Sequence, residues 1–428
     1  MIKQYFKQAL ILLRENKLMS FISIAGTALA IAIIMVIIII MRAKTANYEP
    51  EVNRDRTLYV KWGSAVSKIN KDERNYSCLS LYDIQQAFYP LTTPEAVTAV
   101  YTYGRMLSSV PGTDEEINCE VLYTDDAFWR VFEFGFLAGK SYDAATFKSG
   151  LKQAVICESA ARKLFGGVEE AIGRRLDLNF VAFTVSGVVR DVSKFAEQSY
   201  AEIWLPYTTN SNICSINITG WGEGHTGSFQ CFLLARSAND FLKIRSELAS
   251  SIAKMNANSK EYKLDIMDQP DDFFTQMLHK FSNGGTPPAK VVIRYCVIIF
   301  IILIVPAINL SGLTQSRMRK RISELGVRKA FGATKWSLLW QVLSENFLLT
   351  LIGGLFGLLF AYVGIWILSA WLLASDLGGE ATMNGSMISL WIFFVALIFC
   401  LVLNLLSAGI PAWKVARTTI VNALNERN

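Results

Sequence analysis

The sequence predicts an α-helical membrane protein with four transmembrane helices and a large mixed α/β domain inserted between helices 1 and 2. Three observations favour this fold class. The chain is 52% hydrophobic and only 18% charged, a balance that is unusual for a water-soluble protein. Long apolar runs stand near the start and in the last third of its 428 residues. Between them, residues 42–290 show the mixed patterns of one or two soluble subdomains.

The chain starts with an amphipathic segment that continues into an apolar run. Residues 1–18 place apolar side chains on one helical face, which favours an interfacial helix on the cytoplasmic side over an ordinary flank of a span. The run Ser20–Met41 measures about 33 Å as a helix at ~1.5 Å per residue. It is longer than the core of a cleaved signal peptide, and no clear small-x-small site follows before Arg42. Residues 19–41 are therefore predicted to be an uncleaved first span.

Residues 42–290 combine strand and helix patterns. Strands are predicted at Thr57–Lys61, Val97–Tyr103, Glu120–Thr124, Arg175–Phe180 paired with Phe183–Val189, Glu202–Leu205 and Phe229–Ala235, and helices at Leu81–Phe88, Asp126–Phe132, Glu158–Phe165 and Phe241–Met255. Asn210–Gly227 is rich in Asn, Ser, Thr and Gly, which predicts an exposed loop. The breaker cluster Ser282–Pro288 is expected to return the chain to the membrane.

Three further apolar runs complete the predicted membrane part. The spans are expected at residues 291–313, 338–374 and 387–410, with a short outer loop at 375–386 and a tail at 411–428. Pro306 favours a kink in the second span. In the third span, Gly353, Gly357 and Ala361 recur every four residues, which predicts close packing against another helix.

Residues 314–337 form a strongly basic loop between the second and third spans. It carries seven cations and one acid, Glu324: Arg317, Arg319, Lys320, Arg321, Arg328, Lys329 and Lys335. Such loops stay on the cytoplasmic side, so both termini are predicted inside and the large domain outside. Ile322, Leu325 and Lys329 share one helical face, and Gly332 suits a left-handed helix end. We expect this short helix to receive force from a cytosolic partner, although positive-inside charge alone is the simpler alternative.

No catalytic, metal or cofactor site is predicted. Gly135–Ser141 has three residues between its glycines where a Walker A needs four, and no βαβ context surrounds it. The histidines are expected to be a surface-loop residue (His225) and a juxtamembrane residue (His279). The cysteines show no zinc spacing, and one disulfide such as Cys214–Cys231 remains open. The chain also lacks an aromatic-basic pattern for nucleic acid.

Several segments resemble one family. ELGVRKAFGAT at 324–334 is similar to the E-I-G-[VI]-R-[RK]-A-[LF]-G-A segment of FtsX-type ABC-transporter permeases, the group that includes MacB-like exporters. Residues 16–32 resemble the family's first span, and 154–192 its periplasmic core domain. Residues 341–361 resemble the start of its third span, and 410–425 its C-terminal tail. Ile420 stands where the tail pattern usually has Pro, so the tail geometry departs from the family.

The resemblance implies a permease in the bacterial inner membrane that forms a homodimer or heterodimer. A separate cytosolic ABC ATPase would hold ATP and Mg²⁺, so this chain is not expected to be an enzyme. The ATPase would dock on the basic loop, and the permease would pass its motion to the periplasmic domain. By resemblance, the coupling element includes Glu324, Leu325, Gly326, Arg328, Lys329, Phe331 and Gly332.

Other functions stay open at this point. The main alternative is a membrane-anchored receptor or scaffold that regulates an envelope hydrolase or binds a periplasmic ligand without transport. An ion-coupled carrier would need paired intramembrane charges, which the sequence lacks. Membrane lipid is an expected partner, and a periplasmic adaptor, lipoprotein or hydrolase is a further candidate. The substrate is not indicated by any motif.

Overall fold

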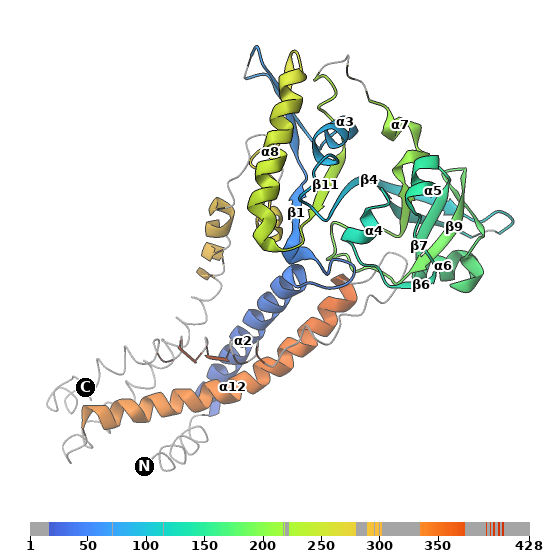
Figure 1. Cartoon of the computed structure of the whole chain (residues 1–428). Helices are drawn as coiled ribbons and strands as arrows, with labels where there is room; N and C mark the ends of the chain where they lie inside the picture. Colours follow the sequence, from blue (N-terminus) through green and yellow to red (C-terminus); the bar gives the residue numbers. More distant parts are fainter. Residues whose placement is uncertain are drawn as a thin grey trace. The chain divides into compact units, whose positions relative to one another are not determined.

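The computed structural model describes residues 17–279, 289–301 and 334–372, apart from 71, 114, 217, 219–221, 295 and 299, together with single positions at 391, 394, 397, 398, 401, 402 and 405. The described residues fall into two compact units (Figure 1). One holds the described residues of 17–43, 292–301 and 334–371, and the other holds Lys44–Val291, which we call the outer domain.

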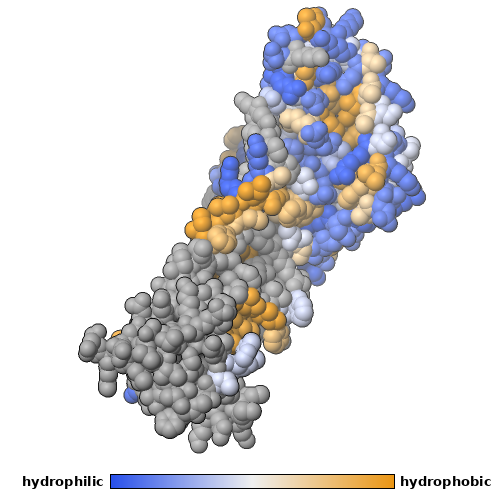
Figure 2. Space-filling model, turned by 90° about the vertical axis from the view of Figure 1, so that its left-hand side faces the viewer, coloured by the Kyte–Doolittle hydropathy of each residue, from blue (hydrophilic) through white to orange (hydrophobic). Residues whose placement is uncertain are grey.

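Two described helices are long and apolar enough to cross a membrane. They are α2 (Lys17–Thr45) and α12 (Lys335–Leu372), whose most apolar windows are Ser20–Ile37 and Phe347–Gly364. In Figure 2 the coloured surface shows continuous hydrophobic patches as well as a large region that is mainly hydrophilic. Residues 289–301 are helical where described. The predicted second and fourth spans lie largely outside the described residues, and so do residues 1–16, 302–333 and 373–390.

The outer domain is built on a mixed sheet. Among the described residues it has nine strands: β1 (Thr57–Val60), β4 (Ala96–Ser109), β5 (Glu116–Thr124), β6 (Phe136–Gly139), β7 (Gln153–Cys157), β8 (Arg175–Leu178), β9 (Val181–Val189), β10 (Ile203–Pro206) and β11 (Phe229–Leu234). The strand order is β1-β11-β4-β5-β10-β7-β9-β6, and β8 pairs with both β4 and β9. Pairing is antiparallel except for β10 with β5 and β7 with β9. The predicted hairpin is confirmed, since β8 pairs antiparallel with β9.

A second, smaller sheet and a long helix form the other part of the outer domain. The sheet has the order β12-β2-β3, with β2 at Gly63–Ser67, β3 at Arg74–Ser77 and β12 at Tyr262–Asp265. Helix α8 (Phe241–Asn258) buries a stripe at helical spacing, formed by Ile244, Leu248, Ile252 and Met255. The opposite face of α8 is polar and exposed, so the helix is amphipathic. Burial of the apolar stripe against the domain stabilises it.

Short helices complete the domain, and their ends follow local capping chemistry. They are α3 (Leu81–Asp83), α4 (Phe128–Val131), α5 (Ala144–Ser149), α6 (Glu158–Phe165), α7 (Ser211–Cys214) and α9 (Phe273–Leu278). Ser80 and Asp83 form a capping box at the start of α3. Helix α6 ends at Gly166, whose φ of 82° is left-handed, as a glycine C-cap allows. Figure 1 shows α6 beside β7 and β9.

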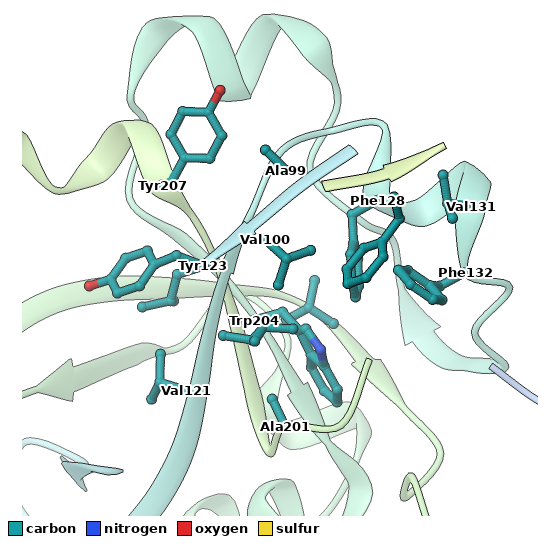
Figure 3. Packing of buried hydrophobic residues seen from close by; sticks show 14 of the residues in the cluster. Ala99, Val100, Val121, Tyr123, Phe128, Val131, Phe132, Ala201, Trp204 and Tyr207 are labelled. Atoms are coloured by element: carbon teal, nitrogen blue, oxygen red, sulfur yellow. The ribbon is translucent and has the colours of Figure 1, made fainter. Parts of the chain in front are cut away.

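Aromatic side chains fill the centre of the main sheet (Figure 3). Trp204 on β10 is fully buried, and its ring lies 5.1 Å from that of Phe134 and 6.3 Å from that of Trp129. The Trp204 Nε1 donates a hydrogen bond to the Ser199 carbonyl at 3.1 Å, so the buried indole is satisfied. Phe128 on α4 packs against Phe132 at 4.8 Å between ring centroids.

Most predicted elements of the outer domain are confirmed, with three differences. Residues predicted as one helix at Leu81–Phe88 divide into α3 and a π-helical turn at Ile84–Phe88. Asn210–Gly227 contains α7 and buried residues, so its prediction as an exposed loop is wrong for part of the segment. Strands β2, β3, β6, β7 and β12 were not predicted, and the Gly135–Ser141 segment contains the edge strand β6.

Candidate functional site

The predicted coupling element lies outside the described residues. Glu324, Leu325, Gly326, Arg328, Lys329, Phe331 and Gly332 all fall in the segment 302–333, so their roles remain predictions. The glycine series of the third predicted span does lie in the described part, on α12. The candidate site is therefore built from two features that the structure describes: the contact between α2 and α12, and the part of the outer domain that follows α2 in the chain.

Helices α2 and α12 approach each other closely along the glycine series. A Cβ atom at Gly353 would lie 2.8 Å from Thr27 Cβ, and one at Gly357 would lie 2.9 Å from the Ala28 carbonyl oxygen. These separations are shorter than normal contacts, so any side chain at these positions would force the helices apart. Ala361, four residues further on, is fully buried. The small residues thus permit a backbone contact that larger side chains would prevent.

The contact does not run along the whole of α12. A Cβ at Gly364 would meet its nearest atom, Val36 Cγ2, at 3.8 Å, which is an ordinary van der Waals distance. A Cβ atom at Gly26 on α2 would have no atom of the described residues within 4 Å. The close approach is therefore local to Gly353 and Gly357.

A buried ion pair holds the segment between α2 and β1. Arg54 Nε donates to Glu51 Oε2 at 2.7 Å, and both side chains are 1% exposed. The same guanidinium donates to the Ala46 carbonyl at 2.7 Å, to the Tyr48 hydroxyl at 3.0 Å and to the Phe195 carbonyl at 2.9 Å. Burial alone would lower the pKa of Arg54, but the Glu51 carboxylate and Tyr48 raise it, so the cation is retained.

The other oxygen of Glu51 reaches a distant loop. Glu51 Oε1 accepts hydrogen bonds from the backbone N–H groups of Gln198 and Ser199, at 3.0 and 3.2 Å, and from the Ser199 hydroxyl at 3.1 Å. Arg54 also lies 4.7 Å below the ring centre of Phe273, the first residue of α9. We call Tyr48, Glu51, Arg54 and Ser199 the Arg54 cluster. It joins the segment after α2 to two remote parts of the outer domain.

The end of the outer domain is fixed to β1 by a second group of polar contacts. Asp271 and Tyr59 exchange two backbone hydrogen bonds of 2.9 Å. The Gln269 side chain accepts from the Lys61 N–H at 2.7 Å and donates to the Trp62 carbonyl at 2.8 Å. His279 Nδ1 lies 2.7 Å from Asp271 Oδ2. The segment around Gln269 and Asp271, near the end of the domain, is thus hydrogen-bonded to β1 and to the residues that follow it, near the start of the domain.

Burial perturbs two further ionisable groups of the outer domain. Asp125 is 2% exposed, and burial raises its pKa from 3.8 to about 6 although four donors face its carboxylate. Burial lowers the pKa of Lys61 to about 8, and this effect exceeds the attraction of nearby Glu197 and Glu51. Asp125 caps the turn that begins α4, because the Phe128 N–H donates to Oδ1 at 3.0 Å. We assign it a structural role.

The histidines and cysteines differ in part from expectation. His225 was expected in a surface loop, but it is fully buried, and its Nδ1 lies 2.6 Å from Asp83 Oδ1. The prediction fails because a buried carboxylate partner satisfies the imidazole. Cys214 and Cys231 are both free thiols in the structure. Among the described residues, no cluster of three or more His, Cys, Asp or Glu side chains could hold a metal ion.

The sequence did not single out Glu51 or Arg54. The available signal was an acid and a base three residues apart in a short segment between an apolar run and a predicted strand. Such spacing is common on protein surfaces, and the partners that bury this pair lie about 145 residues away in the chain, around Phe195 and Ser199.

Comparison with known families identifies both parts of the chain. A family model described as the MacB-like periplasmic core domain matches residues 20–250, which is more than half of the chain. A second, the FtsX-like permease C-terminal region, matches residues 296–420. The chain belongs to the MacB/FtsX-like ABC transporter permeases. Members of this family are inner-membrane proteins with a periplasmic domain, so the outer domain is the MacB-like periplasmic core domain.

Curated relatives of this permease are distant in sequence. The uncharacterized ABC transporter permease YknZ of Bacillus subtilis is 23% identical over 73% of this chain and 71% of its own length. The macrolide export ATP-binding/permease protein MacB of Pasteurella multocida is 24% identical over 72% of this chain. The permease spans 43% of that relative's length, and 35% of the MacB protein of Chromobacterium violaceum.

Solved structures of the same family match the outer part of the permease. The periplasmic region of MacB from Actinobacillus actinomycetemcomitans aligns at a TM-score of 0.36 with 17% identity, covering 55% of this chain and 96% of that one. The extracellular domain of YknZ aligns at a TM-score of 0.34 with 17% identity, covering 48% of this chain and 99% of that one. The family assignment rests on the two family models.

Proposed function

We propose that this permease is the transmembrane subunit of an ABC transporter and passes motion from a separate cytosolic ATPase to its periplasmic domain. The observation that supports this most directly is the contact of α12 with α2 at Gly353 and Gly357. Helix α12 follows the basic loop in the chain, and α2 precedes the outer domain. Two helices in backbone contact shift together more readily than helices separated by long side chains.

The chemistry of the basic loop suits an ATPase surface. Arg328 and Lys329 can pair with acidic side chains, and Leu325 and Phe331 can fill an apolar groove. Gly326 would let the two backbones approach closely. In this proposal Glu324 and Gly332 belong to the same short helix, which moves when the ATPase binds and hydrolyses ATP.

The Arg54 cluster supplies the next step of the proposed path. A buried guanidinium with five partners holds its neighbours in one arrangement, because breaking any contact leaves a buried polar group unpaired. A displacement of the C-terminal end of α2 would therefore reach the loop at Phe195 and helix α9 directly. The permease would act as a dimer, and export or regulation of a periplasmic partner would follow from the movement of the outer domain.

The test is whether the basic loop docks an ATPase. The double substitution Arg328→Glu with Phe331→Ala is expected to abolish co-purification of an ABC ATPase from native membranes while the permease stays folded and membrane-inserted. Arg317→Glu, with the same charge change outside the ELGVRKAFGAT segment, is the matched control and should retain the ATPase. Retained ATPase in the double variant would overturn the docking assignment. Absence of any ATPase from the wild-type preparation would favour the receptor or scaffold instead.

A further inference from the structure

The outer domain contains a pocket that the proposed transport function does not use. Its volume is about 450 Å³, within the range of small-molecule sites. It opens between strands β4 and β11 on one side and the segments that carry α7 and His225 on the other. The lining residues are Ser80, Leu81, Tyr101, Tyr103, Asn210, Asn212, Ile213, Ser215, Ile216, Gly224, Thr226, Gly227, Ser228 and Phe229.

Aromatic rings form one wall of this pocket. Tyr101 on β4 is paired in register with Phe229 on β11, and their ring centroids are 5.3 Å apart. Tyr103 lies at an irregularity in the pairing of β4 with β5 and packs against Tyr123 at 5.7 Å. Bulges of this kind redirect a side chain. The Tyr103 side chain is 43% exposed, so part of its ring is free to contact a ligand.

The pocket also presents neutral hydrogen-bonding groups. The hydroxyls of Tyr101, Tyr103, Thr226 and Ser228 and the side-chain amide of Asn212 form no hydrogen bond with other described residues. Among the described lining residues, none carries a charged side chain. A charged ligand would lose hydration on entry and gain no counter-charge, whereas a neutral polar ligand would find donors and acceptors.

The rim of the pocket is held in place by contacts behind it. His225 and Asp83, both fully buried, are joined at 2.6 Å between Nδ1 and Oδ1. Glu223 Oε2 accepts hydrogen bonds from three consecutive backbone N–H groups, those of residues 260, 261 and 262, at 3.0 to 3.1 Å. Glu223 has a left-handed φ of 48°, which costs energy in a residue other than glycine. These contacts hold Glu223 and His225, which flank the lining residue Gly224, in one arrangement, and this lowers the entropic cost of binding at that edge of the pocket.

We propose that this pocket binds a small uncharged ligand rich in hydroxyl and amide groups, with neutral saccharides as the chemical class. The apolar C–H face of a sugar ring packs on the exposed Tyr103 ring, and its hydroxyls reach Asn212, Thr226 and Ser228. The site goes beyond the proposed coupling function and does not depend on it, because all of its residues lie in the outer domain.

The test uses the full-length permease in detergent and two matched disaccharides. N,N′-diacetylchitobiose is neutral, and chitobiose has the same ring skeleton with two free amines that are cationic below their pKa. Isothermal titration calorimetry at pH 5.5, where the amines of chitobiose are protonated, is expected to show binding of the neutral sugar and at least about tenfold weaker binding of the amine. Equal affinity for the two sugars would overturn the proposal, as would no detectable heat with either of them.

Substitutions connect the binding to this pocket. Tyr103→Ala is expected to weaken binding of N,N′-diacetylchitobiose about tenfold or more, and Asn212→Ala is expected to weaken it as well. Thr102→Ala is the matched control, because Thr102 is exposed on the same strand and does not line the pocket. The affinity of this variant for the sugar should equal that of the wild type. Thermal unfolding of each variant verifies folding. Unchanged affinity in both pocket variants, or binding of a neutral tripeptide in place of the sugar, would refute the proposal.

Discussion

At the scale of single residues, burial of Asp125 links the stability of the outer domain to pH. The carboxylate accepts from Thr98, Ala99, Tyr89 and Phe128, yet burial still raises its pKa to about 6. The folded chain therefore keeps a proton that the unfolded chain loses above its ordinary pKa of 3.8. Stability contributed by the protonated form falls as pH rises from about 4 to about 6, by about 3 kcal/mol at ~1.36 kcal/mol per pKa unit.

The corresponding prediction concerns Asp125→Asn. The variant cannot ionise, so its Tm relative to that of the wild type is expected to rise between pH 4 and pH 7. Thermal unfolding of the detergent-solubilised permease at several pH values measures this difference. Asp72→Asn, at an exposed position, is the control and should follow the wild-type profile. A constant difference between the Asp125 variant and the wild type over this pH range would contradict the prediction.

The Arg54 cluster gives a second prediction at the same scale. Glu51→Ala leaves the Arg54 cation buried without its carboxylate and also frees the N–H groups of Gln198 and Ser199. Breaking a buried pair from one side costs about 3 kcal/mol or more. Chemical unfolding followed by tryptophan fluorescence should show this loss. The Arg56–Glu95 pair is the control: its side chains are 27% and 49% exposed, so Glu95→Ala should cost less than about 1 kcal/mol.

The sequence was a poor guide to these particular side chains. His225 stands in a segment rich in Asn, Ser, Thr and Gly, and this composition predicts a surface position. It is buried because the folded chain brings it against Asp83, which lies 142 residues earlier. Glu51 and Arg54 gave no signal of burial either. In each case at least one partner that buries the side chain lies more than 140 residues away, and the local sequence pattern does not report such distant pairing.

At the scale of elements, the contact between α2 and α12 predicts opposite outcomes for two glycines of one helix. Gly357→Ala introduces a Cβ 2.9 Å from the Ala28 carbonyl oxygen and from Ile31 Cβ, so the helices must separate. Gly364→Ala introduces a Cβ with its nearest neighbour at 3.8 Å and also improves helix propensity. We expect Gly357→Ala to lower the Tm of the permease and Gly364→Ala to leave it unchanged or raise it.

Cross-linking tests the same contact independently of stability. Cysteines introduced at Val36 and Gly364, where an added Cβ would lie at an ordinary 3.8 Å from its neighbour, are expected to be joined by a short bifunctional reagent in a background without the exposed Cys296. Gly357→Ile should reduce the yield. An undiminished yield in the Gly357→Ile background would show that the helices are not held together at these glycines.

Elements with strong periodicity were predicted well, and short polar ones were not. Helix α6 lies within its predicted bounds, and the β8–β9 hairpin follows from two alternating runs around a turn. Strand β3 has the sequence RNYS, whose first two residues are exposed, so it lacks an apolar pattern and forms only because β2 pairs with it. Strand β7, QAVIC, is a short buried run that periodicity cannot distinguish from helix.

At the scale of the whole molecule, the sequence predicted the division into an apolar helical part and a soluble domain, but not the sheet order. Strand β11 pairs with β4 and β1, which precede it by more than 120 residues. The tyrosine-lined pocket depends on that order, because Ser80, Tyr101, Asn212 and Phe229 come together only through it. No pattern in one sequence specifies such long-range pairing.

The ties at both ends of the outer domain lead to a prediction about its motion. The Arg54 cluster fixes the segment after α2, and Gln269 and Asp271 fix the last part of the domain to β1. Because both ends are joined to one continuous core, ATP-driven movement should displace the domain as a single body. Spin labels at Ser149→Cys on α5 and Lys254→Cys on α8 should therefore keep the same distance before and after nucleotide trapping.

Pulsed dipolar spectroscopy on the permease–ATPase complex measures these distances, with doubly labelled copies diluted in unlabelled ones so that only pairs within a copy contribute. Singly labelled Ser149→Cys complexes report on movement between copies, and their distance is expected to change on trapping with ATP and vanadate. Glu51→Ala should broaden the distribution within a copy, because the loop at Ser199 loses its anchor. A change of the α5–α8 distance in the wild type would mean that the domain bends internally, and the rigid transfer proposed for the Arg54 cluster would then be wrong.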